Sequence, residues 1–158
     1  MARILSDETL GAIRALLPRY PRPLAALLPA LHLVQEQLGG YVSHEAEVEV
    51  AEVLAVPPTR VREAVSFYTM FHSQPRGRHQ VKICRNLACQ LRGADRLIAH
   101  AERLLGVQCG ETTGDGRVTL EHEECLASCG TAPMLWCNGA LVENLDEGAL
   151  ERFLAELP

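Results

Sequence analysis

The chain has 158 residues, of which 47% are hydrophobic but only 4% aromatic, so its core must consist mostly of aliphatic side chains. The formal net charge of −5 argues against the basic face that a nucleic-acid-binding protein needs. No apolar run is long enough to span a bilayer, and the acidic start is not a secretory signal, so we expect a soluble, intracellular protein without direct membrane insertion.

The first 72 residues predict four helices. Each begins at a residue that commonly starts a helix, either a capping serine or a proline in the first turn, and continues with apolar residues at helical spacing. Proline or glycine residues separate the segments. The predicted starts are Ser6, Pro23, Ser43 and Pro57. We therefore expect a small antiparallel helical bundle over residues 1–72.

A polar segment with proline and glycine, SQPRGR at residues 73–78, predicts a domain boundary. After this segment, the spacing of the apolar residues alternates between strand-like and helical. The predicted elements are a strand at 79–84, a helix at 91–105, a strand at 117–120, a hairpin at 133–143 and a helix at 146–157. Asn138-Gly139 is the preferred pair for the tight turn of that hairpin. The fold class is therefore α+β, with an N-terminal helical bundle followed by a compact α/β domain over residues 79–158.

All six cysteines lie in this second domain. Disulfides are rare in reducing compartments, so metal binding or redox chemistry is the better explanation. Cys84 and Cys89 have four residues between them, and Cys125 and Cys129 have three. Both pairs lie in loops directly after predicted strands. Because loops at the same end of neighbouring strands come together, the four thiolates can converge on one point.

Four thiolates suit either zinc or an iron–sulfur cluster. Zinc sites usually use pairs of cysteines with two residues between them, and the chain has none. The same absence excludes a C-x-x-C redox dithiol. A two-iron cluster can take two separated pairs, one for each iron. The spacing favours a [2Fe-2S] cluster, with zinc and reduced structural thiols as the alternatives.

The other two cysteines, Cys109 and Cys137, are expected to be small buried apolar residues. An enzyme with a reactive thiol at Cys109 would need a neighbour that stabilises the thiolate, and the sequence shows no clear one. His122 lies near the second pair, but a solvated position at a strand end fits it better than a ligand role. The chain carries neither G-x-G-x-x-G nor a P-loop, so no nucleotide site is expected.

With both cysteine pairs placed, the sequence resembles the thioredoxin-like [2Fe-2S] ferredoxin subunit of NADH dehydrogenases, the complex I 24 kDa subunit family. That subunit is the small partner of the NADH- and FMN-binding subunit of respiratory complex I. The resemblance covers most of the chain. The matching stretches are LLPALHLVQEQLGGYV (27–42), VSFYTMF (65–71), CRNLACQLRGAD (84–95), GETTGDGRVTL (110–120) and ECLASCGTAPML (124–135).

The resemblance implies a thioredoxin-like domain with Cys84, Cys89, Cys125 and Cys129 as cluster ligands. It implies an electron-transfer subunit of a respiratory NADH:quinone oxidoreductase, itself without catalytic residues, in a larger multisubunit redox complex. FMN and NADH would be bound only by the partner flavoprotein subunit. The expected location is cytoplasmic, peripheral on the inner face of the membrane.

Two alternatives remain for the parent complex and the cofactor. Equivalent subunits of NAD-dependent formate dehydrogenases and NAD-linked hydrogenases also end directly after the last helix, although LRGAD (91–95) and TAPM (131–134) favour the respiratory version. A zinc-stabilised interaction module is more remote.

The aromatic segment FYTMF (67–71) is expected to pack between the bundle and the α/β domain, with a docking patch for the flavin-bearing subunit as the alternative.

Overall fold

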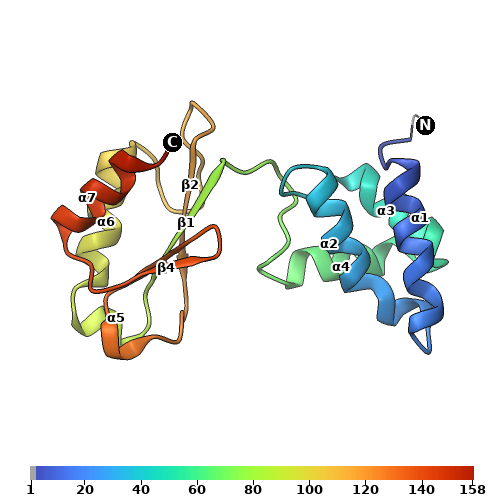
Figure 1. Ribbon diagram of the computed structural model, residues 1–158, viewed down its shortest axis with the longest axis horizontal. Coiled ribbons are helices and arrows are strands. Elements are labelled where there is room, and N and C mark those ends of the chain that lie inside the picture. Colours follow the sequence, from blue (N-terminus) through green and yellow to red (C-terminus); the bar gives the residue numbers. More distant parts are fainter. Residues whose placement is uncertain (1–2) are drawn as a thin grey trace. The chain divides into compact units, whose positions relative to one another are not determined.

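The computed structural model describes residues 3–158 and divides into two compact units, Met1–Pro75 and Arg76–Pro158 (Figure 1). Each unit has its own hydrophobic core. The elements of the first unit are α1 (Asp7–Leu16), η1 (Leu17–Arg19), η2 (Pro23–Ala26), α2 (Leu27–Gln37), α3 (His44–Leu54) and α4 (Pro58–Phe67). The four predicted helices are therefore confirmed. Within residues 3–158, no helix has both the length and the apolar character needed to cross a membrane.

Capping and aliphatic packing explain the bundle. The Ser6 hydroxyl accepts a hydrogen bond from the Thr9 N–H at 3.1 Å, and the Ser43 hydroxyl accepts one from the Ala46 N–H at 3.2 Å. These bonds satisfy backbone donors at the starts of α1 and α3 that have no partner within the helix. The inward faces of the four helices then bury leucine, valine, isoleucine and alanine side chains in one core.

The start of the second helix differs from the prediction. Residues 23–26 form a 3₁₀ turn before α2 instead of the first turn of a helix that begins at Pro23, and Leu24 in this turn is 47% exposed. In the aromatic segment only Phe71 is buried in the bundle core. Phe67 is 75% exposed and Met70 is 48% exposed, and the expected packing of this segment between the bundle and the α/β domain stays a prediction.

The second unit is a four-stranded mixed sheet with helices. Its elements are β1 (His79–Cys84), α5 (Leu87–Leu91), α6 (Ala94–Leu105), β2 (Val118–Glu123), η3 (Cys129–Thr131), β3 (Leu135–Cys137), β4 (Ala140–Val142) and α7 (Glu147–Glu156). The strand order is β2-β1-β3-β4, with β1 parallel to β2 and antiparallel to β3. Side chains of the strands, α6 and α7 share one core, and the two helices lie side by side in Figure 1.

The predicted hairpin is confirmed, while the predicted helix at 91–105 is shorter and follows a separate helix. Asn138 and Gly139 have φ values of 47° and 97°, both positive as a type I′ turn requires. Gly93 interrupts the helical stretch with φ 94°, which separates α5 from α6 and leaves Leu91 79% exposed. The strand predicted at 117–120 runs on to Glu123, because it pairs with β1 as far as Cys84.

Candidate functional site

The two cysteine loops leave the sheet at the same edge. Parallel pairing places Cys84, the last residue of β1, opposite Glu123, the last residue of β2. The Arg85 N–H donates to the Glu123 carbonyl at 2.9 Å, which extends this pairing one residue into the loop. Cys125 follows only two residues after the end of β2. The expected meeting of the loops is thus a consequence of the strand register.

The first pair is buried. The Asn86 side chain accepts from the Leu87 N–H at 2.7 Å and starts α5, which turns Cys89 inward. Cys84 and Cys89 are 2% and 1% exposed, and they form a small apolar cluster together with Ala94, Ala132 and Met134. Burial, followed by the hydrogen bond and the charge of Cys84, raises the pKa of the Cys89 thiol to about 11. A metal must therefore displace a firmly held proton to bind this sulfur.

The second pair is exposed. Cys125 and Cys129 both lie at the surface, on a loop in which Ala127 adopts φ 64°. Leu126 packs against the apolar cluster that holds Cys84 and Cys89, and this contact anchors the loop. Cys129 is close enough that its charge contributes to the raised pKa of Cys89.

The structure thus brings Cys84, Cys89 and Cys129 together and places Cys125 on the same exposed loop. Among residues 3–158, no three cysteine, histidine or acidic side chains already have the arrangement of a metal site. The donor set itself fits a two-iron cluster, because it offers two sulfur pairs from two loops and no hard oxygen ligand among them. One pair lies on buried elements and the other on an exposed loop.

The remaining cysteines are poorly suited to chemistry. Burial and the neighbouring Glu102 carboxylate raise the pKa of the Cys109 thiol to about 11. Burial also raises the pKa of the Cys137 thiol, which packs in the core of the sheet. A thiol with a raised pKa is mostly protonated near neutral pH and is therefore a weak nucleophile. His122 is exposed on β2, with its Nε2 atom 3.3 Å from Arg85 Nη1.

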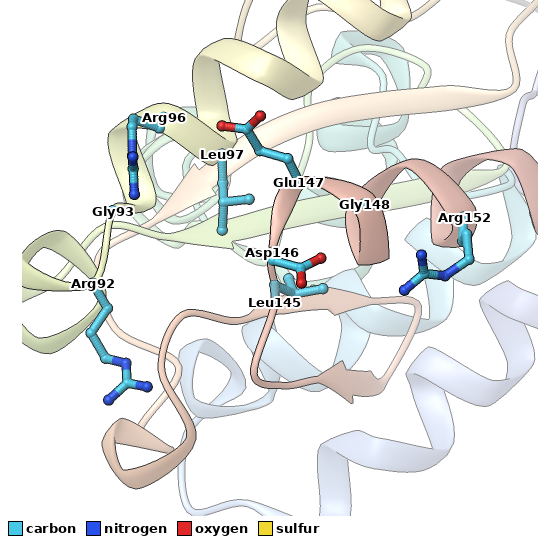
Figure 2. Close-up of a pocket in the computed structure, with 9 residues that line it drawn as sticks. All are labelled: Arg92, Gly93, Arg96, Leu97, Leu145, Asp146, Glu147, Gly148 and Arg152. Carbon is cyan, nitrogen blue, oxygen red and sulfur yellow. The ribbon is translucent and has the colours of Figure 1, made fainter.

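A cavity of about 480 Å³ lies in the same unit, between the start of α6 and the start of α7 (Figure 2). Arg92, three residues after Cys89, lines it together with Arg96, Arg152 and Asp146. In Figure 2 the guanidinium groups surround the hollow at separate points rather than meeting at one centre. The cavity therefore adds positive charge beside α5 but shows no convergent site of its own.

The comparisons with known proteins agree with this geometry. The model of the thioredoxin-like [2Fe-2S] ferredoxin family matches residues 13–158. An NADH-quinone oxidoreductase subunit from Rhizobium meliloti (strain 1021) is 39% identical over 142 residues, which cover 90% of this chain and 84% of that protein. NADH dehydrogenase [ubiquinone] flavoprotein 2, mitochondrial, of Dictyostelium discoideum is 36% identical, and the match covers 96% of this chain and 62% of that protein.

Solved structures show the same fold. An NAD+-reducing [NiFe]-hydrogenase in the H2-reduced state matches with a TM-score of 0.68 and 25% identity over 84% of this chain. The air-oxidised state matches with a TM-score of 0.66 and 24% identity over 85% of this chain. This chain spans only 22% of either hydrogenase chain, so these matches concern one part of a larger protein.

The predicted family, the α+β fold class and the [2Fe-2S] cofactor are confirmed. The relatives' names support the predicted respiratory function better than the hydrogenase alternative, which rests on likeness of fold at lower identity. The match over residues 13–158 leaves little of the chain outside it. The chain belongs to the thioredoxin-like [2Fe-2S] ferredoxin family.

Proposed function

We propose that this chain is the electron-carrying subunit of the NADH-oxidising flavoprotein module of an NADH:quinone oxidoreductase, with its cluster held by Cys84, Cys89, Cys125 and Cys129. The parallel register of β1 and β2 carries the proposal, because it brings both cysteine pairs to one sheet edge. The test is whether NADH reduces the cluster only when the flavoprotein partner is present.

The two pairs have different tasks in this proposal. Cys84 and Cys89 are fixed by β1, by α5 and by the apolar cluster around Met134, so they provide a rigid, water-poor half of the site. Cys125 and Cys129 close the site from the exposed loop. When bound, the cluster accepts and returns one electron at a time.

The charge of the site favours a low reduction potential. Four thiolates are a strongly negative ligand set, and an added electron is disfavoured beside them. Arg85 is half-exposed and forms an ion pair with Glu124 at 3.7 Å. Solvent and this carboxylate therefore reduce the stabilisation that Arg85 can give to negative charge at the site. Arg92 at the end of α5 is exposed to solvent. The ligands are thus only modestly neutralised by nearby cations.

The chemistry of the nicotinamide belongs to the partner in this account. The sequence holds no nucleotide-binding glycine motif, and the only set of residues equipped for redox chemistry is the cysteine site. FMN on a flavoprotein partner would split the two-electron hydride of NADH into single electrons. We place the assembled complex peripherally on the cytoplasmic face of the membrane, with residues 1–72 and 79–158 as separate functional modules.

The helical unit offers a docking surface for that partner. A groove of about 440 Å³ is lined by Leu24, Leu28, Phe67 and Tyr68. Phe67 is 75% exposed and stacks edge-on against Tyr68 with ring centroids 5.1 Å apart. An ion pair between Arg60 and Glu63 lies beside these apolar side chains. Aromatic anchors with charged groups around them are typical of protein interfaces, and we assign this surface to the flavoprotein subunit.

Replacing Phe67 by Glu should weaken binding of the flavoprotein subunit by about tenfold or more, because an aromatic anchor is lost and a charge is buried. The fold should be unaffected, since the side chain is largely exposed. Co-expression followed by affinity purification and analytical ultracentrifugation measures the effect.

The matched control is Leu104→Glu on α6, which also places a charge at an exposed leucine, 47% exposed, but in the other unit. It should leave partner binding unchanged. Wild-type copurification of the Phe67→Glu variant, with an unaltered circular dichroism spectrum, would show that this groove is not the docking surface.

A further inference from the structure

One carboxylate ties the exposed cysteine loop to the hairpin. Glu143 directly follows β4, and its Oε1 atom accepts hydrogen bonds from the hydroxyls of Ser128 and Thr131, the latter at 2.5 Å. The two hydroxyl oxygens are 3.0 Å apart. Ser128 directly precedes Cys129 and Thr131 ends the short turn that Cys129 begins. The carboxylate therefore holds the chain on both sides of that cysteine.

Backbone bonds place Glu143 at this point. The Asn144 N–H donates to the Thr131 carbonyl at 2.8 Å, and the Leu145 N–H donates to the Pro133 carbonyl at 2.9 Å. The tight hairpin sets this alignment, since it pairs Leu135 with Val142 and returns the chain beside the cysteine loop. Backbone hydrogen bonds on its C-terminal side thus place the carboxylate beside the cysteine loop.

The Glu143 carboxylate holds a cysteine loop that burial does not fix. Cys84 and Cys89 are held by apolar packing, whereas Cys125 and Cys129 are exposed. Hydrogen bonds from the Ser128 and Thr131 side chains lower the pKa of Glu143, so the group is ionised at neutral pH. Hydrogen bonds to an ionised acceptor are stronger than those between neutral groups.

We propose that Glu143 is a positioning residue of the cluster site: it fixes the loop that carries Cys125 and Cys129, and its charge favours the oxidised over the reduced state of the site. The inference builds on the proposed function, since it requires these cysteines to be the ligands. A fixed negative charge opposes the addition of an electron nearby. Loss of the two hydroxyl bonds frees the loop and speeds cluster loss.

Three variants of the full chain, purified without oxygen, separate the two effects. Glu143→Gln removes the charge but keeps an amide oxygen that can accept a hydrogen bond from a hydroxyl. The equilibrium constant for one-electron reduction should therefore rise about threefold, which corresponds to a reduction potential about 28 mV higher, and the cluster lifetime should stay near that of wild type. Glu143→Ala removes both charge and anchor, and Thr131→Val removes one anchoring hydroxyl but keeps the charge. Both should lose the cluster several-fold faster to a chelator, and Thr131→Val should not show the rise in potential.

The readouts are redox titration, the electron paramagnetic resonance spectrum and the rate of cluster loss, with Glu156→Gln at the exposed end of α7 as the charge control. That control should match wild type in all three. Wild-type potential, spectrum and lifetime in Glu143→Ala and Thr131→Val would overturn the inference and leave the proposed function standing. A wild-type chain without iron and sulfide would instead overturn the proposed function, and this inference with it.

Discussion

Replacing any one of Cys84, Cys89, Cys125 or Cys129 by Ser is expected to remove or strongly alter the spectrum of the dithionite-reduced cluster. A serine hydroxyl is a harder and far less acidic ligand than a thiol, so the cluster loses one of its four cysteine ligands. The visible absorbance and the electron paramagnetic resonance signal of protein purified without oxygen provide the measurement.

Cys109→Ser and Cys137→Ser are the controls, and both should retain the wild-type signal. These cysteines pack with the core of the sheet rather than with the cluster site. The circular dichroism spectrum of each serine variant should also be measured to check that it is folded. A hydroxyl at a buried position such as Cys89 costs about 1–3 kcal/mol of stability. A folded Cys125→Ser protein with an unchanged spectrum would exclude Cys125 as a ligand.

The isolated chain is expected neither to bind NADH measurably nor to oxidise it, even with an artificial electron acceptor present. A hydride carries two electrons, and the proposed site accepts one, so a flavin must stand between them. Dithionite should still reduce the isolated chain. Addition of the flavoprotein partner should make NADH a reductant, with partial reduction of this cluster if its potential lies well below that of NADH.

Stopped-flow spectra of the chain mixed with NADH decide this point. The control is the same mixture with the FMN-loaded partner added. Bleaching of the visible absorbance by NADH alone, without flavin or partner, would mean that the chain oxidises NADH itself. The electron-carrier account would then be wrong.

The local signals in the sequence predicted most of the fold. Ser6 and Ser43 cap helices where the sequence indicated, because capping is decided by a few neighbouring residues. Asn138-Gly139 forms the predicted turn because both residues tolerate positive φ. The solved structures that match the chain confirm the α+β class.

The failures of prediction come from effects that periodicity does not record. The sequence pattern predicts a helix that begins at Pro23, but residues 23–26 wind as a 3₁₀ turn and leave Leu24 exposed. The helix expected at 91–105 is interrupted by Gly93. The spacing of apolar residues does not show that this glycine adopts a left-handed conformation. The length of β2 depends on its partner strand, which is a tertiary property.

The meeting of the two cysteine loops was predictable from the sequence, but the contacts that support these loops were not. Cysteines placed just after two strands indicated that the loops would meet, and the register of β1 with β2 gives the reason. The asymmetry between a buried and an exposed pair had no signal in the sequence. Glu143 lies 14 residues from Cys129, and only the return of the hairpin brings it to Ser128 and Thr131.

Iron and acid-labile sulfide analysis of the whole chain, purified without oxygen, tests the central claim most directly. The four-cysteine site should hold about two irons and two sulfides per chain, in a red-brown protein. Stoichiometric zinc without sulfide, in a colourless protein, would contradict the electron-carrier account and favour the zinc-stabilised alternative.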